Sequence, residues 1–200
     1  VLRECFSAFQ RQVANGAPKL MMSRYPLQLS SYFGEGRVDE VRSFAEAANG
    51  GALSWPLLNG LARVKLGSED FIGAVEDSKK SAEMATEEGD SEAAQAWLVA
   101  GSIAMEAKKP NEAISAWENS LSLDPNQALT KNNIAYVLSD KLGDHKRALP
   151  LAQAAAEASP RNPQILDTLG TVQLALGNNE EAIQSLAEAV RRGASATTQV

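Results

Sequence analysis

The side chains of this 200-residue chain with the most chemical potential are a single histidine and a short acidic run. His145 lies in the segment GDHKRA, and Glu87, Glu88 and Asp90 lie together in the segment EEGD. A histidine can act as a base near neutral pH or bind zinc, and neighbouring carboxylates can exchange protons or bind a cation. Each reaction needs partner groups in register, and the sequence supplies none. We therefore expect a solvated turn histidine, no catalytic residue, no metal site and no enzymatic activity.

Two other features resemble reactive sites only superficially. The segment FGEGRVDE, residues 33–40, contains two glycines, but a phosphate-binding loop joins a strand to a helix, and this segment reads as a turn between helices. Cys5 is the only cysteine, so it cannot form an internal disulfide, and it lies on an apolar helical stripe. We expect Cys5 to pack as a small hydrophobe. No cofactor is expected.

Composition and charge narrow the range of partners. The net charge is −6, and counting side chains gives +1 for residues 1–52, −7 for residues 53–127 and 0 for residues 128–200. Without a strongly basic face, nucleic acid is not an expected partner, and the acidic middle reads as a solvated helix surface. No apolar run reaches the roughly 20 residues that span a bilayer, so we expect no direct membrane insertion. The compartment stays open between cytoplasmic and periplasmic, and the chain, which begins at Val1, reads as part of a longer protein.

The elements that would position any site repeat along the chain. An alanine near the start of each expected second helix recurs at Ala74, Ala113, Ala148 and Ala182, and Val41 takes its place in the first unit; the separations are 33, 39, 35 and 34 residues. Such a period indicates one supersecondary unit used several times. The longest separation includes the segment TEEGDSEA, which we expect to lengthen a helix or a loop.

Within each unit four positions recur. A large residue is followed four residues later by a small one, twelve residues after that by the alanine, and four residues further on by the last residue of the pattern. A spacing of four places two residues on one helical face, and small residues let two helices approach closely. The unit near residue 128 has one extra residue, which we place in its turn, and Lys65 replaces an expected apolar residue. Asn111 and Asp144 are the expected N-caps of two second helices. The offsets appear in Leu58, Ala62, Ala74, Ser78; Trp97, Gly101, Ala113, Trp117; and Leu166, Gly170, Ala182, Leu186.

These residues resemble the tetratricopeptide repeat, in its bacterial type, over residues 94–193 most clearly and over 55–88 and 20–50 more weakly. The resemblance implies an all-α fold, a right-handed α-α superhelix of about four to five helix-turn-helix repeats. It divides the chain into a helix at 1–19 that could be half of a truncated repeat, repeats at 20–52, 53–93, 94–127, 128–162 and 163–193, and a tail at 194–200.

The resemblance also implies where a partner would bind. In such proteins the first helices of successive repeats line a concave groove that takes a peptide or a partner helix. Asn133 could bind a ligand backbone through its amide, and Tyr136 could offer a flat apolar surface, although both residues could equally be ordinary surface or packing positions. The partner-binding residues expected on this basis are Asn59, Arg63, Ser102, Asn132, Asn133, Tyr136, Asp140, Asp167 and Thr171.

One class of ligand is disfavoured. Chaperone co-factors with these repeats hold a C-terminal carboxylate with cations and amides, but Leu98, Ser102, Gln164 and Thr168 stand at the corresponding positions here. A carboxylate would be held poorly without those cations. The expected groove is neutral to mildly acidic and suits a neutral or basic segment.

The leading interpretation is a protein-interaction scaffold that binds a peptide or partner protein. Two alternatives stay open. The chain could be an assembly module that forms homo-oligomers through uncapped repeat ends, or a regulatory segment of a larger enzyme or envelope-associated protein.

Overall fold

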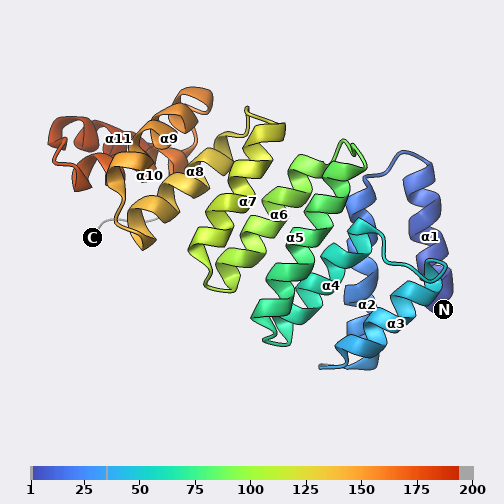
Figure 1. Cartoon of the computed structure of the whole chain (residues 1–200). Helices are drawn as coiled ribbons and strands as arrows, with labels where there is room; N and C mark the ends of the chain where they lie inside the picture. Colours follow the sequence, from blue (N-terminus) through green and yellow to red (C-terminus); the bar gives the residue numbers. More distant parts are fainter. Residues whose placement is uncertain (1, 35, 194–200) are drawn as a thin grey trace. The chain divides into compact units, whose positions relative to one another are not determined.

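The computed structural model describes residues 2–34 and 36–193, and all regular structure in these ranges is helical (Figure 1). The predicted all-α fold of tandem helix pairs is confirmed. The helices are α1 (Leu2–Ala14), η1 (Lys19–Ser23), α2 (Arg24–Phe33), α3 (Val38–Ala48), α4 (Trp55–Gly67), α5 (Phe71–Glu87), α6 (Ala93–Glu106), α7 (Pro110–Leu123), α8 (Ala128–Tyr136), η2 (Val137–Lys141), α9 (His145–Ala158), α10 (Pro163–Ala175) and α11 (Asn179–Arg191).

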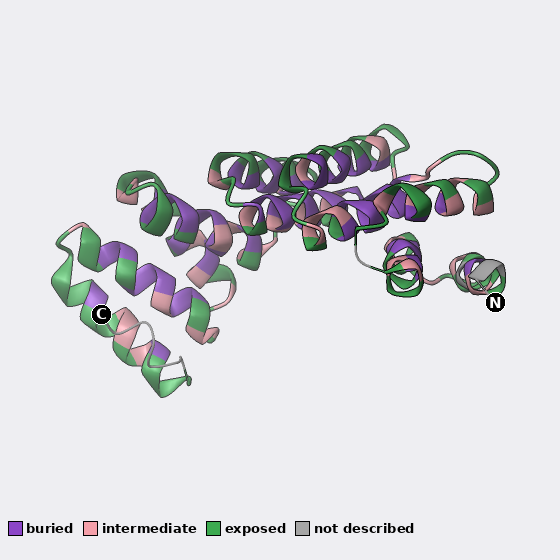
Figure 2. Cartoon of the chain, turned by 90° about the horizontal axis from the view of Figure 1, so that it is seen from below, coloured by how far each residue is buried: buried purple, intermediate pink, exposed green. Residues whose placement is uncertain are grey.

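The chain forms two compact units. Unit 1 extends as far as Leu123 and contains α1 to α7, and unit 2 begins at Asp124 and contains α8 to α11. In both units a first helix (α2, α4, α6, α8 or α10) packs against the second helix that follows it. Buried residues follow the faces along which neighbouring helices pack (Figure 2). No helix in the described ranges is long and apolar enough to cross a membrane.

Close approach within each pair depends on small residues, as the spacing predicts. A Cβ atom on Gly101 would lie 2.3 Å from Nε1 of Trp117, and one on Gly170 would lie 2.6 Å from Cγ of Leu186. The Trp117 Nε1–H also donates to the Leu98 carbonyl oxygen at 3.1 Å. The glycines therefore leave room for large side chains of the second helix to lie across the first.

The N-terminal helices share an apolar core in unit 1. Phe6 and Tyr25 are buried there, with ring centroids 4.9 Å apart, and Leu29 and Val41 are buried in the same cluster. Cys5 packs against this cluster and is half-buried, in agreement with its expected role as a small hydrophobe.

Two irregularities of the repeat take different forms. The segment TEEGDSEA, residues 86–93, contributes the end of the 17-residue helix α5, which stops at Glu87, and the loop that leads to α6. The spacing placed the extra residue of the unit near residue 128 in the turn, and this prediction is wrong. The extra residue widens the end of the first helix into the π-helical segment η2, where the Leu142 N–H bonds the Val137 carbonyl oxygen, five residues back, at 3.2 Å.

Of the two N-caps predicted from the sequence, the structure confirms one. Asp144 is the N-cap of α9, as predicted, and its carboxylate accepts the Arg147 N–H at 3.3 Å. Asn111 is not an N-cap, because α7 already begins at Pro110. Proline is favoured at a first helical position, since its missing N–H would be unpaired there in any case.

Candidate functional site

The first-helix face of unit 2 exposes apolar side chains between polar ones. On α8, Leu129 and Tyr136 are exposed and seven residues apart, so they lie on one side of the helix. On α10, which contacts α8, Thr171 and Leu174 are exposed. Tyr136 and Leu174 have exposed fractions of 44% and 54%, which is high for large apolar residues.

The two asparagines of α8 differ in exposure. Asn132 has an exposed fraction of only 8%, and its Oδ1 atom is buried without a hydrogen-bond partner. Asn133 is half-buried and therefore more accessible. Of the two amides, Asn133 is the better placed to reach a ligand backbone, with both a donor and an acceptor available on the side chain.

The π-helical segment places a charged pair beside Tyr136. Lys141 Nζ lies 2.8 Å from Asp140 Oδ2 and 5.7 Å from the centroid of the Tyr136 ring. The hydrogen bond from Lys141 lowers the pKa of Asp140, and the same bond raises the pKa of Lys141. Both groups stay charged at neutral pH, so this end of the α8 face combines an aromatic ring with a neutralised ion pair.

Asp167 and Thr171 lie one turn apart on α10. Asp167 is half-buried and Thr171 is exposed. Unit 2 thus carries six of the predicted partner-binding residues on α8, on η2 and on α10, although one of them, Asn132, is buried: Asn132, Asn133, Tyr136, Asp140, Asp167 and Thr171.

The predicted residues in unit 1 are less available. Asn59 was expected on an open surface, but it is completely buried and neither polar atom of its side chain has a hydrogen-bond partner. The next residue, Gly60, is packed so tightly that a Cβ atom there would lie 2.2 Å from the Ser23 carbonyl oxygen. The face of α4 that carries Gly60 is therefore covered by the chain that leads into α2. Arg63 is exposed, and the half-buried Ser102 donates its hydroxyl to the Leu98 carbonyl oxygen at 3.1 Å.

The structure does not assemble the chemical groups that the sequence offers. Within the described ranges, no group of three or more His, Cys, Asp or Glu side chains could hold a metal ion. His145 is half-buried, rather than fully solvated as expected, and its Nδ1 atom lies 2.9 Å from Ser139 Oγ. This contact fastens the π-helical segment to the start of α9.

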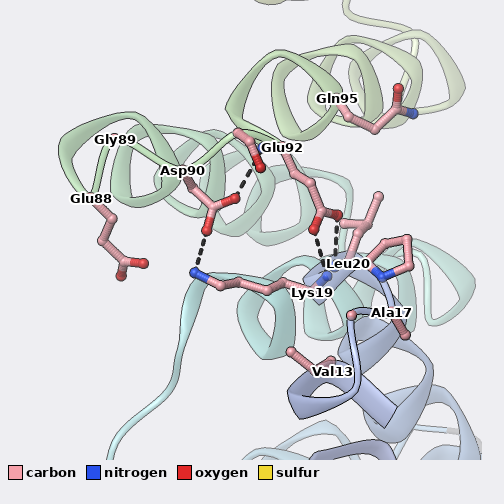
Figure 3. A pocket seen from close by; sticks show the side chains of 12 residues that line it. Val13, Ala17, Lys19, Leu20, Glu88, Gly89, Asp90, Glu92 and Gln95 are labelled. Atoms are coloured by element: carbon pink, nitrogen blue, oxygen red, sulfur yellow. Dashed lines mark hydrogen bonds and ion pairs between the residues drawn. The ribbon is translucent and has the colours of Figure 1, made fainter.

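Unit 1 contains a pocket that sequence reasoning missed. It has a volume of about 1010 Å³ and is open to solvent between the α1–α2 connection and the α5–α6 loop (Figure 3). Lys19 Nζ bonds Asp90 Oδ2 at 2.5 Å, and the Glu92 carboxylate accepts the backbone N–H groups of Lys19 and Leu20 at 2.5 and 3.1 Å. The acidic run was visible in the sequence, but nothing there indicated a partner about 70 residues away.

The charges of this pocket hold each other in the ionised state. Burial is the largest single influence on the pKa of Asp90 and would raise it. The hydrogen bonds that Asp90 accepts from Lys19 and from the Glu92 N–H together outweigh burial, so the pKa of Asp90 is lowered. The hydrogen bond to Asp90 raises the pKa of Lys19. The pair is therefore fully charged at neutral pH.

Comparison with known proteins identifies the repeat. Family models described as tetratricopeptide repeat match residues 60–128 and residues 141–197, which together make up well over half of the chain. These matches include α4 to α7 in unit 1 and α9 to α11 in unit 2.

Similarity to individual proteins is more distant. Tetratricopeptide repeat protein 33 of Xenopus laevis is 35% identical over 88 residues, which are 42% of this chain and 33% of that protein, so the chain spans about a third of this relative. The structure of YrrB, a repeat protein with an unusual peptide-binding site, has a TM-score of 0.63 at 16% identity and covers 96% of this chain and 95% of its own. MamA has a TM-score of 0.63 at 19% identity, covering 78% of this chain and 89% of its own. At these identities the two structures show a shared fold.

Proposed function

The chain belongs to the tetratricopeptide repeat family, and from this premise we propose that it is a protein-interaction scaffold without catalytic activity. Its binding surface is formed by first-helix faces, and its ligand is an extended segment of a partner protein. The peptide-binding site of YrrB, which shares the fold, supports this proposal.

The observation that carries the proposal is the α8 and α10 face of unit 2. Tyr136 and Leu174 are exposed there, and each can accept an apolar side chain of a ligand. Asn133 and Thr171 offer hydrogen-bonding groups on the same two helices, as a ligand backbone requires. This combination of apolar anchors and a few polar groups is typical of peptide recognition.

Charge favours a neutral or basic ligand. Asp140 and Asp167 both lie on this side of unit 2, and the region carries more acidic than basic groups at the ligand-facing positions named here. The basic residues needed to hold a terminal carboxylate or a nucleic acid backbone are not present at the matching positions. Arg63 and Ser102 are the accessible residues that unit 1 adds, and the buried Asn59 is left out.

A peptide library screened against two variants tests the proposal. The double variant Asn133→Ala/Tyr136→Ala should weaken the best library ligand at least about tenfold, because it removes one backbone contact and one aromatic surface. The control Tyr32→Ala/Asn119→Ala truncates the same residue types at exposed positions of unit 1 and should leave affinity unchanged. Equal affinity for wild type and the Asn133/Tyr136 variant would remove this face from the proposal.

A second candidate function is self-association. Ile183 and Val190 are exposed and seven residues apart on α11, so one side of this helix presents two large aliphatic residues to solvent. A second copy of the chain could cover them, as neighbouring repeats cover each other. Light scattering across a concentration series measures the molar mass of the wild type and of the double variant Ile183→Glu/Val190→Glu. If α11 forms the contact, the molar mass of the wild type rises with concentration and that of the variant does not. A wild-type protein that stays monomeric at high concentration would exclude it.

A further inference from the structure

A short segment of the chain, residues 18–22, lies against α4, α6 and the α5–α6 loop of unit 1. We propose that residues 18–22 are an internal ligand, and that their site accepts a partner segment with a basic residue followed by a large aliphatic one. The inference rests on the proposed function in treating first-helix faces as binding surfaces, but it concerns a separate site and has its own test.

The basic side chain of the internal ligand is held by a buried acid. Lys19 Nζ lies 2.5 Å from Asp90 Oδ2. The Asp90 side chain has an exposed fraction of 3%, whereas the Lys19 side chain has one of 51%. The Asp90 carboxylate is therefore buried in unit 1, whereas the Lys19 ammonium group that covers it is exposed and can move away into solvent.

The backbone of the internal ligand is held by a second acid. One oxygen of Glu92 accepts the Lys19 N–H at 2.5 Å, and the other accepts the Leu20 N–H at 3.1 Å. Figure 3 shows Glu92 reaching from the start of α6 towards these two amides. A carboxylate that accepts two successive N–H groups recognises a peptide backbone whatever its side chains are, and such charged bonds are strong.

The aliphatic side chain of the internal ligand packs into the helix face. Leu20 lies against the buried cluster that contains Ala62 of α4 and Val99 and Ile103 of α6. It also lies against the cluster that contains Trp55. Leu20 thus fills a place between first helices that an apolar anchor of a foreign peptide could take.

The segment has little structure of its own. η1 is a 3-10 helix of five residues, a conformation with poor hydrogen-bond geometry that rarely persists without support. Gly16, with a φ of 92°, and Pro18 precede it, so a turn separates it from α1. The contacts to Asp90, to Glu92 and through Leu20 hold the start of the segment, and Met22, which is buried in the N-terminal core cluster, anchors its end. A foreign segment that makes the contacts to Asp90, to Glu92 and at the Leu20 position can replace residues 18–20 there while Met22 stays in the core.

The surroundings favour a basic competitor that approaches from solvent. The open pocket of about 1010 Å³ lies beside Lys19 and is lined by Glu88 as well as Asp90 and Glu92. An incoming segment can reach both acceptor carboxylates through this pocket while α4 and α6 stay in place.

Internal occupancy lowers the apparent affinity for a foreign peptide. The measured dissociation constant is the intrinsic one divided by the fraction of molecules with an empty site. A variant that releases the segment should therefore bind more tightly than wild type. This is the opposite of what ordinary interface mutations do.

The test uses a fluorescein-labelled copy of residues 17–23, APKLMMS, and fluorescence anisotropy. The release variant Lys19→Glu/Leu20→Ser should bind this peptide at least about ten times more tightly than wild type. Adding Glu92→Gln to the release variant should abolish binding, and a peptide with glutamate in place of lysine should not bind. Lys80→Glu makes the same charge change at an exposed position of α5 and should behave as wild type.

Circular dichroism must show that the release variant keeps its helices. If it unfolds, hydrogen exchange in wild type replaces it: millimolar unlabelled peptide should accelerate exchange at the Lys19 and Leu20 amides, which Glu92 protects. A folded release variant that binds no better than wild type, or amide exchange that the peptide leaves unchanged, would overturn the inference. Binding lost in Asn133→Ala/Tyr136→Ala but not in Glu92→Gln would also overturn it, while supporting the proposed function.

Discussion

The two units of this chain use one repeat pattern and differ in the availability of their first-helix faces. In unit 1 the short helix η1 covers part of α4, and Asn59 is completely buried. In unit 2 no described segment is inserted before α10, and Tyr136 and Leu174 are exposed. The comparison teaches that the repeat determines which helices pair, whereas a few residues between the pairs determine whether a face can bind a partner.

The units also differ in how their helix pairs are fastened. Ser81 Oγ donates to the Trp55 carbonyl oxygen at 2.6 Å, and Ser120 Oγ donates to the Ala94 carbonyl oxygen at 2.6 Å, at the same repeat position. In unit 2 the corresponding residues are Ala155 and Ala189, which are fully buried. At this position α5 and α7 of unit 1 are tied to the preceding helices by hydrogen bonds, whereas α9 and α11 of unit 2 rely on close packing.

A second matched position differs in charge. Lys65 of α4 bonds Asp77 of α5 at 2.8 Å, and both side chains are largely buried. At the equivalent position of unit 2, Ser185 Oγ donates to Gln173 Oε1 at 2.8 Å. The lysine that departs from the apolar pattern therefore has an acidic partner on the neighbouring helix, and unit 2 uses a neutral pair instead.

The largest expected effect comes from breaking the charged pair. Asp77→Ala should lower the free energy of unfolding of unit 1 by about 2 to 3 kcal/mol, because it leaves the Lys65 ammonium largely buried without a partner. Ser185→Ala should cost unit 2 about 1 kcal/mol, the usual value of a neutral hydrogen bond. Urea titrations followed by tryptophan fluorescence report on unit 1 alone, since Trp55, Trp97 and Trp117 all lie there. Hydrogen exchange of α10 and α11 reports on unit 2.

The double variant Lys65→Met/Asp77→Leu is the control for that prediction. It removes both charges and keeps the apolar volume, so it should restore most of the stability that Asp77→Ala loses. A double variant as unstable as Asp77→Ala would show that packing, and not the unpaired charge, sets the cost.

The next effect compares two glycines at one repeat position. Gly101→Ala should destabilise unit 1 by about 1 kcal/mol, because the clash with the rigid Trp117 ring exceeds the gain in helix propensity. Gly170→Ala should leave unit 2 nearly unchanged, because the atoms it meets first belong to the flexible Leu186 side chain. Tryptophan fluorescence in urea again measures the stability of unit 1, and hydrogen exchange of α10 and α11 measures that of unit 2. Equal losses in both units would contradict the role assigned to the Trp117 ring.

The smallest effect concerns pH. Because the pKa of Asp90 is lowered, its ionised carboxylate stabilises the folded state at any pH above the ordinary carboxyl range. This stabilisation is lost as the pH falls through the lowered pKa. The raised pKa of Lys19 means that its contribution is present below the ordinary lysine range and is lost as pH rises through the raised value. Protection of the Lys19 amide, corrected for intrinsic exchange, should therefore stay constant between about pH 5 and about pH 9.

The pair Asp140–Lys141 in unit 2 serves as the comparison for pH. Its pKa values move in the same directions, but both side chains are half exposed, so stability should show no measurable dependence on this pair. Opening of η1 near neutral pH would show that a group other than the Lys19–Asp90 pair controls it.

Much of the fold could be predicted because its determinants are local. The period of about 34 residues indicated the helix pairs, and the contact of Gly101 with Trp117 followed from offsets of 4 and 12. Exposure of Tyr136 and Thr171 likewise follows from helical periodicity. These features depend on residues within one repeat, where helix geometry fixes which side chains share a face.

Other features could not be predicted from one sequence. An extra residue can enter a turn or a helix, and only the packing of α8 against α9 selects the π-helical segment. The bonds that the Lys19 and Leu20 N–H groups donate to Glu92 join segments far apart in the chain. No periodicity connects such segments.

The sequence by itself determined that this chain is a series of helix pairs, because an apolar stripe with small residues every 34 or so positions can be buried only by stacking. The tertiary structure alone decided which faces stay open. That choice depends on whether a non-repeating segment such as η1 finds charged and apolar partners on helices about 70 residues away, and such partners come together only when the chain has folded.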